Sequence, residues 1–536
     1  MNSTAHVNTA PRRRHRQRRV RWAAVLIVFS LVAVATSTSS WAKSPSAASG
    51  GNASGVLKLA AGLSPLGPLH FDPATSVVNG DLVWEEMIFG TLLRWNAKGG
   101  LDPWMAESYK VVDPQTVTMT LRKGMTFTDG TPFDAEAVKT GLLNTLNGAT
   151  AQSTASRHAG FKFLADVVVD SPTQVTMKLN TPGASDFLES MAHREGAIVN
   201  PKQIGTGEID TKPIGAGPFM FSAYTPDQIL SVRKNKDFFD KKHWKIGGID
   251  YVHAPTGPAA TTGLLAGEVD IATLQVADVA QVEADGRFNV LSGSTDYGYV
   301  IFQMCPGKPP FDNPQVRKAV QLAFDRDAIV QLAYQGQAEP AYGLWPENNV
   351  NFNPASKKLN KYDPKKAKQI LAKAGVSDVS FEMHYVAATN YGALAEILQS
   401  QLKAIGITAT IFPDQDILNA FIVPQKPGAQ VIPGSRRNVD KYNRLYAPGN
   451  TAVLCGVARQ DIMDVVIPTA AMALNDPARA TAFKKAEQMA ADNANPIPLV
   501  YTVTNTAVTK SRVGGDIAFS QATGGLLLDN VVMKNT

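Results

Sequence analysis

A run of thirteen residues at positions 23–35 carries no charge and only one polar side chain. A helix that crosses a bilayer needs about 20 apolar residues, so this run is too short for a comfortable membrane span. Seven arginines precede the run, and a stretch rich in small residues follows it at positions 36–42. This three-part order is typical of a secretory signal peptide. We therefore predict that residues 1–42 are an export signal and that the remaining chain folds outside the cytoplasm.

The sequence leaves the details of this signal open. The segment could be cleaved after Ala42 or kept as a membrane anchor, and its arginines could instead form a basic tail for nucleic acid. Arg18-Arg19 could belong to a twin-arginine signal, although the flanking residues fit that pattern poorly, so the export route also stays open. No cysteine lies near the expected cleavage point, so we expect no lipid anchor on an N-terminal cysteine.

Charge is balanced in the rest of the chain, although the whole sequence has a net charge of +6. Of the 52 lysines and arginines, seven lie in the leader, which leaves 45 basic residues against 46 acidic ones. Nucleic-acid-binding domains carry a concentrated basic face. We therefore expect no nucleic-acid partner.

Strand and helix patterns alternate along the remaining chain, which is too long for a single hydrophobic core. This order favours an α/β architecture with two or three domains. Two similar antiparallel hairpins are predicted, each with alternating apolar residues after a turn that contains proline. Asp134, Asn313 and Asp363 are predicted N-caps of helices. We expect strands at 56–61 and 407–412, hairpins at 111–122 and 168–179, and helices at 81–93, 135–146, 314–324, 363–374 and 391–404, with Asp327 starting a further helix that Gly336 ends.

The sequence contains few signs of catalytic chemistry. It has no phosphate-binding G-x-x-x-x-G-K-[ST] motif, and none of its eight histidines belongs to an H-E-x-x-H zinc motif. Its two cysteines, Cys305 and Cys455, are too few for a multi-cysteine metal site. They form one disulfide bond or remain two buried free thiols, and sequence spacing does not decide between these. We expect no metal, no cofactor and no catalytic residue.

Six segments in a fixed order identify a family. They are L-D-P-W-M-A-E-S-Y at 101–109, L-R-K-G-M-T-F-T-D-G-T-P-F at 121–133, P-I-G-A-G-P-F at 213–219, N-K-D-F-F at 235–239, the stretch 310–328 with V-R-K-A and F-D-R, and the stretch 362–375 that begins Y-D-P. Together they resemble the large extracytoplasmic solute-binding proteins of ABC importers, solute-binding family 5, which includes oligopeptide-, dipeptide- and nickel-binding proteins.

This resemblance implies an α/β, two-lobed periplasmic-binding-protein-like fold, of type II in its large form, with an extra small domain and a ligand cleft between the lobes. Lobe I would comprise residues 43–77, 197–298 and 498–536. The extra domain would be 78–196, and lobe II would be 299–497. Two crossings near Tyr299 and Pro498 would form the hinge.

The resemblance also implies which residues to test for ligand binding. One departure matters, because the tryptophan of the peptide binders' W-x-A-D-Y segment is missing at the best counterpart, R-R-N-V-D-K-Y at 436–442. The two arginines there could face an anionic ligand or form a solvated surface pair. The predicted ligand-binding residues are Phe71, Tyr297, Tyr299, Asn390, Tyr391, Arg436, Arg437, Asp440, Tyr442 and Tyr501.

The implied function is that of an importer's binding component, a monomer that delivers a small solute to a membrane permease without altering it. A peptide or peptide-like ligand is favoured, while an oligosaccharide, an opine-like acid and a metal chelate stay open. Two alternatives use the same fold, namely a secreted hydrolase with a scattered active site and an exported sensor module.

Overall fold

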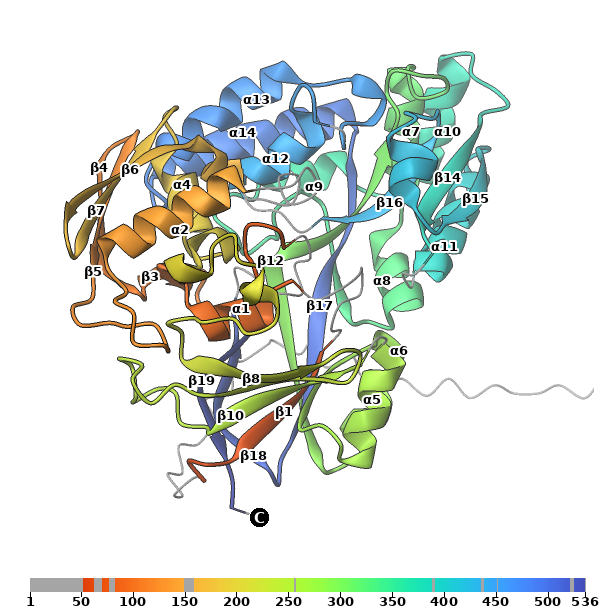
Figure 1. Ribbon diagram of the computed structural model, residues 1–536. Coiled ribbons are helices and arrows are strands. Elements are labelled where there is room, and N and C mark those ends of the chain that lie inside the picture. Colours follow the sequence, from red (N-terminus) through yellow and green to blue (C-terminus); the bar gives the residue numbers. More distant parts are fainter. Residues whose placement is uncertain are drawn as a thin grey trace, which may run out of the picture. The chain divides into compact units, whose positions relative to one another are not determined.

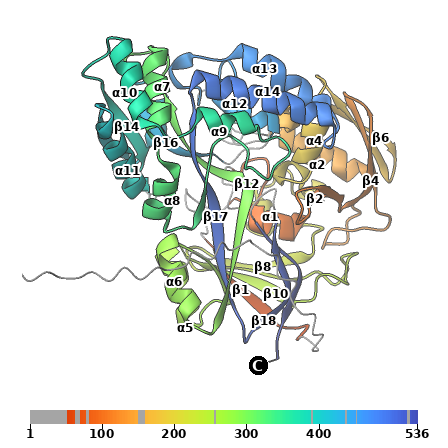
Figure 2. The same cartoon turned by 180° about the vertical axis from the view of Figure 1, so that it is seen from behind.

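The computed structural model describes residues 52–61, 70–76, 82–148, 159–254, 257–387, 391–434, 438–450, 452–520 and 525–535 (Figures 1 and 2). The predicted export signal at 1–42 lies outside the described residues. Among the residues that are described, no helix is both long enough and apolar enough to cross a membrane.

Eleven strands of the described chain form one mixed sheet, in the order β15-β14-β16-β12-β17-β11-β1-β10-β9-β8, with β13 paired to β17. Parallel pairs join β1 to β10 and β11, and β14 to β15 and β16, whereas the remaining pairs are antiparallel. The bounds are β1 Val56–Ala61, β8 Phe219–Thr225, β9 Ile229–Lys234, β10 Gly248–His253, β11 Ile271–Leu274, β12 Phe288–Met304, β13 Ala338–Pro340, β14 Ser380–Val386, β15 Thr408–Asp414, β16 Ala429–Gly434 and β17 Ile497–Thr509.

The two long strands β12 and β17 run side by side through the middle of this sheet (Figure 1). The first half of β12 and the second half of β17 lie towards β11 and β1, whereas their other halves lie towards β16 and β13. The antiparallel pairing between them shifts register between Ser294 and Tyr299. Both strands therefore link two sets of elements, and their pairing is interrupted where they pass from one to the other.

Helices pack around the β14–β16 end of the sheet and around its middle. Two of them start at a capping side chain that the sequence predicts. In α7, Asn313 accepts a hydrogen bond from the Gln315 amide and proline follows. Asp363 caps α10 in the same way. The bounds are α7 Pro314–Ala323, α8 Arg326–Tyr334, α9 Pro354–Leu359, α10 Pro364–Lys373, α11 Tyr391–Ala404, α12 Asn438–Tyr446, α13 Gln460–Val466 and α14 Pro477–Asn493.

The helix α8 begins at Arg326, one residue before the predicted start at Asp327. Asp325, and not Asp327, accepts the hydrogen bond from the Ala328 amide and caps the helix. Both aspartates suit an N-cap by type, and the difference lies in the backbone, because Phe324 ends α7 in an extended conformation that leaves Asp325 at the next start. The predicted end holds within two residues, because the helix stops at Tyr334 and Gly336 has a positive φ of 79°.

The two predicted hairpins are confirmed and form a single four-stranded sheet, ordered β4-β5-β7-β6. Their inner strands pair with each other, so the similar sequences pack as neighbours. Asp134 caps the adjoining helix α2, as predicted, by accepting a hydrogen bond from the Ala137 amide at 3.0 Å. The bounds are β4 Ala106–Asp113, β5 Thr116–Leu121, β6 Leu164–Ser171, β7 Gln174–Leu179, α2 Ala135–Asn147 and α4 Ala184–Ser190.

The remaining elements lie against the other end of the large sheet. The helix predicted at 81–93 is shorter, because the chain turns at Gly90, whose φ is 70°, and continues as a strand at Leu93. A carboxyl-terminal hairpin packs on the same core cluster as this helix. The bounds are α1 Leu82–Phe89, β2 Leu93–Trp95, β3 Leu101–Pro103, α5 Gly257–Ala266, α6 Val276–Ala284, β18 Val513–Phe519 and β19 Leu526–Met533.

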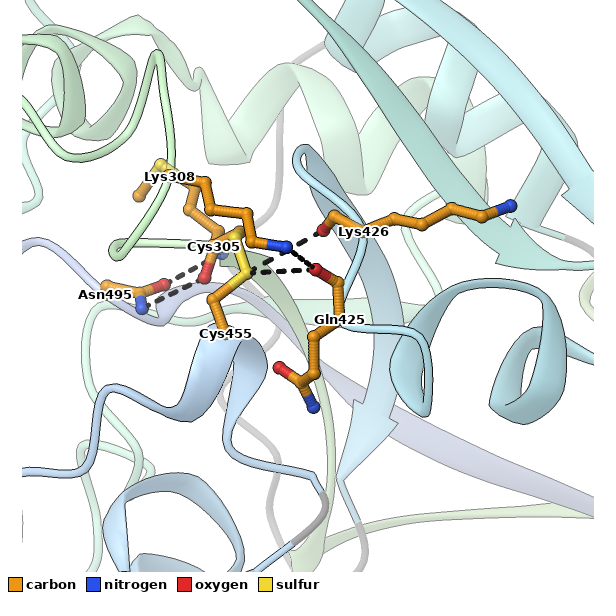
Figure 3. The surroundings of a disulfide bond; sticks show 7 residues. Cys305, Lys308, Gln425, Lys426, Cys455 and Asn495 are labelled. Atoms are coloured by element: carbon orange, nitrogen blue, oxygen red, sulfur yellow. Dashed lines mark hydrogen bonds between the residues drawn. A yellow bond between two sulfur atoms is a disulfide. The ribbon is translucent and has the colours of Figure 1, made fainter.

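A disulfide bond joins Cys305 to Cys455 across 150 positions of sequence (Figure 3). Cys305 follows the last residue of β12, and its Cα lies 5.3 Å from that of Cys455. Asn495 fixes the same strand end, because its side chain both accepts from the Met304 amide and donates to the Met304 carbonyl. Of the two states that the sequence leaves open for the cysteines, the structure has the bridge.

Candidate functional site

Three of the predicted tyrosines come together beside the interrupted pairing of β12 and β17. Tyr299 lies on β12, Tyr501 on β17 and Tyr442 on α12, and all three belong to one hydrophobic cluster that also contains Trp345. Tyr299 and Tyr501 are opposite each other in the register of the two strands. The structure thus brings three of the ligand-binding candidates into one assembly, which we call the junction cluster: Tyr299, Trp345, Lys441, Tyr442 and Tyr501.

A buried ammonium group lies at the centre of the junction cluster. The Lys441 Nζ atom is 3.9 Å from the centroid of the Trp345 ring and 4.8 Å from that of Tyr299, and it donates to the Leu344 carbonyl. Aromatic faces attract cations, most strongly when both are removed from water. These contacts stabilise a lysine that has no exposed surface.

The hydroxyl groups of Tyr442 and Tyr501 form hydrogen bonds with the protein itself. Trp345 Nε1 donates to the Tyr442 hydroxyl at 3.2 Å, and the Tyr501 hydroxyl donates to the Gly343 carbonyl at 2.6 Å. The Tyr442 ring also stacks on Phe483 with centroids 5.7 Å apart. Tyr442 and Tyr501 therefore hold the loop that carries Trp345 against α12 and β17, and their contact with a ligand stays a prediction.

Glu487 of α14 holds the loop that carries Trp345. Its carboxylate accepts hydrogen bonds from the amides of Leu344, at 2.7 Å, Trp345, at 3.3 Å, and Asn353. Burial raises the pKa of Glu487 to about 7, because the surrounding protein penalises the charged form more than these donors favour it. The carboxyl group is thus a structural acceptor that titrates near neutral pH.

A buried ion-pair network connects α4 to α12 and α14. Arg479 Nη2 donates to Asp186 at 3.2 Å and to Glu189 at 3.5 Å, and the Asn438 side chain donates to Glu189. The arginine and both carboxylates are almost fully buried. Removal of Arg479 should be strongly destabilising, because it would take the buried cation away from two buried carboxylates.

The other predicted residues do not join the junction cluster. Phe71 packs in a separate core, edge-to-face with Phe221 and Tyr224. Tyr391 begins α11 in a third core, where burial raises its pKa to about 12. Asp440 is buried in α12, next to the junction cluster. Tyr297 lies on β12, and Asn390, Arg436 and Arg437 lie outside the described residues, so the ligand-binding role of all ten residues stays a prediction.

The sequence analysis missed a cavity of about 390 Å³ that none of the ten predicted residues lines. Its size lies in the range of small-molecule sites, about 300–1,000 Å³. Four of the seven tryptophans of the chain line it, together with Glu86 and Arg94. Three of those tryptophans fall within 21 positions of sequence, and this local enrichment is the one signal that could have identified the cavity. They line the cavity from α1, from β2 and from the segment after β3: Trp84, Trp95 and Trp104.

Comparison with known families decides what kind of protein this is. Residues 100–417 match the model of the bacterial extracellular solute-binding proteins, family 5 Middle, which covers more than half of the chain. The chain belongs to this family. The resemblance drawn from six short motifs is therefore confirmed, and the matched range contains all six.

Known relatives of this family 5 protein bind small solutes. The glutathione-binding protein GsiB of Salmonella paratyphi A is 30% identical over 316 residues, which is 57% of this chain and 60% of that relative. The ABC transporter substrate-binding protein CtaP of Listeria monocytogenes has a TM-score of 0.77 at 22% identity, covering 90% of this chain and 100% of CtaP. The dipeptide-binding protein of Pseudoalteromonas sp. SM9913, solved with Met-Leu, has a TM-score of 0.74 at 20% identity, covering 89% and 100%.

These structural likenesses confirm the predicted fold class of this family 5 protein, the two-lobed α/β periplasmic-binding-protein fold. Among the described residues no group of three or more His, Cys, Asp or Glu side chains is arranged to hold a metal ion.

Proposed function

We propose that this protein is the extracytoplasmic substrate-binding component of an ABC importer. It captures a small solute in a cleft between its lobes and delivers the solute, unchanged, to a membrane permease. The observation that carries this proposal is the family match over residues 100–417. The leader at 1–42 supports it independently, because a signal of that type would export the protein to the periplasm or the cell envelope.

The mechanism follows from the interrupted pairing of β12 and β17. Four residues of β12, at 295–298, stand opposite one residue of β17 between the pairs Ser294–Val503 and Tyr299–Tyr501. A strand pair with an interrupted register bends more easily than a continuous one. We therefore assign the hinge to residues 295–298 of β12. Closure about it would exclude water from the cleft and strengthen each polar contact with the solute.

The domain limits are part of the same proposal. Lobe I comprises residues 43–77, 197–298 and 498–536, lobe II comprises 299–497, and the extra domain comprises 78–196. The limit at 298 is supported by the change of neighbours along β12. Along β17 that change comes between Thr502 and Val503, a few residues after the limit at 498. The extra domain is supported by the separate four-stranded sheet within 106–179.

The ligand class is a peptide or a peptide-like molecule. One relative is named as a glutathione-binding protein and one structural neighbour holds the dipeptide Met-Leu. Binding needs no chemical step, so the protein is not an enzyme in this proposal and works as a monomer with its permease.

Mass spectrometry of small molecules released by denaturing the purified protein tests the proposal. A stoichiometric peptide-like solute is expected, and adding that solute back should raise the unfolding temperature in proportion to the logarithm of its concentration above Kd. Turnover of the solute by the purified protein would instead favour a secreted hydrolase. Asp440→Ala should weaken binding if α12 contributes the anchor of the solute, and unchanged affinity would remove Asp440 from the site.

A further inference from the structure

The tryptophan-lined cavity is enclosed by segments that are far apart in sequence. Its walls come from the end of β1, from α1 and β2, and from β17, β18 and β19. Figures 1 and 2 both show α1 beside the β18–β19 hairpin. The junction cluster contributes no residue to it. The cavity is therefore a separate feature of the fold.

Indole rings form much of its wall. Trp104 lies between Trp244, with centroids 6.3 Å apart, and the Arg94 guanidinium, which is 5.8 Å from its ring. Trp84 packs edge-to-face on Tyr251 at 6.1 Å. Extended aromatic faces of this kind suit an apolar body or an organic cation, because the ring quadrupole attracts positive charge.

Buried hydrogen-bonding groups of the wall lack partners in the protein. Among the described residues, nothing accepts from the indole N–H groups of Trp84, Trp104 and Trp244, or pairs with the Thr506 hydroxyl. All four residues line the cavity, and each is at most 3% exposed. These donor atoms have almost no accessible surface of their own, so they do not open into the cavity and do not decide what occupies it.

One carboxylate in the wall is also without a partner. Arg94 is paired with Asp529 at 3.3 Å, and His193 with Glu195 at 3.1 Å. In contrast, Glu86 makes no side-chain hydrogen bond or ion pair within the described chain, and burial raises the pKa of its carboxyl group to about 7, against a weaker opposing effect of Arg94. The unbalanced charge of the cavity is therefore negative.

We propose that this cavity binds a small organic ammonium ion. The indole rings and the Glu86 carboxylate hold the cation. A cation placed between aromatic rings and one carboxylate gains both electrostatic attractions. The proposal rests on the lining of this cavity and does not depend on the importer proposal.

Choline and its neutral isostere 3,3-dimethylbutan-1-ol provide the test, because they share shape and hydroxyl group and differ in charge. Isothermal titration calorimetry on the full chain should give choline at least tenfold tighter binding. Tryptophan fluorescence should respond to choline, since four of the seven tryptophans line the cavity. Equal affinities for the two probes, or no choline binding at millimolar concentrations, would overturn the proposal.

Two further measurements connect the effect to Glu86. Glu86→Gln should lower choline affinity at least tenfold and leave the affinity for the neutral isostere unchanged, whereas Glu136→Gln, the same charge change on the exposed face of α2, should alter neither. The second measurement needs no variant. Choline affinity of the unmodified protein should rise as the pH is raised through 7, since the carboxylate then ionises, and a flat profile from pH 6 to 8 would exclude Glu86 as the counter-charge.

Other ionisable groups line the cavity with Glu86 or lie against it. Arg94 and Asp529 form an ion pair, and Tyr251, whose pKa burial raises, stays neutral. His193 also lines the cavity. The variants identify the group that titrates, because the pH dependence should disappear in Glu86→Gln and persist in His193→Gln.

Discussion

Replacement of Glu487 by alanine should loosen the loop that carries Trp345. The carboxylate accepts from three backbone amides, of Leu344, Trp345 and Asn353, and its own side chain is 1% exposed. Alanine supplies no acceptor, and nothing else on α14 reaches these amides. The variant therefore leaves three backbone amides buried without an acceptor.

The expected loss follows from two opposing effects. Three unpaired buried donors cost about 3–9 kcal/mol, at about 1–3 kcal/mol each. Removal of the carboxyl group also removes the cost of ionising it in a buried place, which is about 3 kcal/mol for a pKa raised from 4.5 to about 7. We expect a net loss of about 3 kcal/mol at pH 7, and hence roughly a hundredfold increase in local opening.

Hydrogen exchange measured by mass spectrometry reports this opening directly in the peptide that spans 343–353. Glu347→Ala is a matched control in the same loop, because Glu347 makes an exposed ion pair with Lys357, and such pairs contribute about 0–1 kcal/mol. Exchange in the control should change less than about fivefold. If Glu487→Ala exchanged no faster than the control, the carboxylate would not be what holds the loop.

The raised pKa of Glu487 predicts that the free energy of unfolding depends on pH. The folded pKa of Glu487 is raised to about 7, above the unfolded value of 4.5, so its contribution to stability is complete below pH 4.5 and is lost as the pH rises through 7. Between pH 5 and 8 this group alone should remove about 2–3 kcal/mol. Glu487→Gln should lose that dependence, and urea unfolding at the two pH values would contradict the reasoning if both proteins changed alike.

Three further predictions concern other parts of the structure. Reduction of the bond between Cys305 and Cys455, which closes a loop of 150 residues, should lower the free energy of unfolding by up to about 5 kcal/mol, measured by circular dichroism with and without reductant. Arg479→Met should cost about 3–5 kcal/mol in calorimetry, because it removes the buried cation that pairs with Asp186 and Glu189, and a neutral result would contradict the ion-pair geometry. Gly434→Ala should cost about 1–3 kcal/mol, since an added Cβ would meet the Tyr299 ring at 1.9 Å, and Gly434→Ala combined with Tyr299→Leu should recover part of that loss.

Local signals gave most of the secondary structure correctly from the sequence. The two hairpins and the helices capped by Asp134, Asn313 and Asp363 are where turn and capping residues place them, because each signal acts through atoms a few positions away. The failures are also local in origin. At α8 two aspartates compete for the same cap, and the backbone left by the preceding helix decides between them.

The site could be predicted only in part, since its residues are brought together by long-range pairing. Family position singled out Tyr299, Tyr442 and Tyr501 as ligand-binding candidates, and that role stays a prediction. That the three are neighbours was not predicted, and the buried hydroxyl contacts of Tyr442 and Tyr501 depend on a loop at 343–353 that no motif marks. The tryptophan-lined cavity is still harder to predict from the sequence. Its wall combines residues from near 60, 84–104, 193, 244, 273 and 504–529, and no spacing rule relates those positions.

The junction cluster and the proposed hinge are adjacent, and this adjacency has a mechanical consequence. A hinge confines motion to a few residues only if the chain on each side is rigid. Tyr299, the first residue of β12 to regain its pairing, is held between Gly434 and the Lys441 ammonium group, and its partner Tyr501 is fixed through the Gly343 carbonyl. The proposed bend is thereby limited to residues 295–298, where the register of the two strands shifts. A substitution that loosens the cluster, such as Glu487→Ala, should therefore spread the motion into lobe II and weaken solute binding even though Glu487 touches no solute.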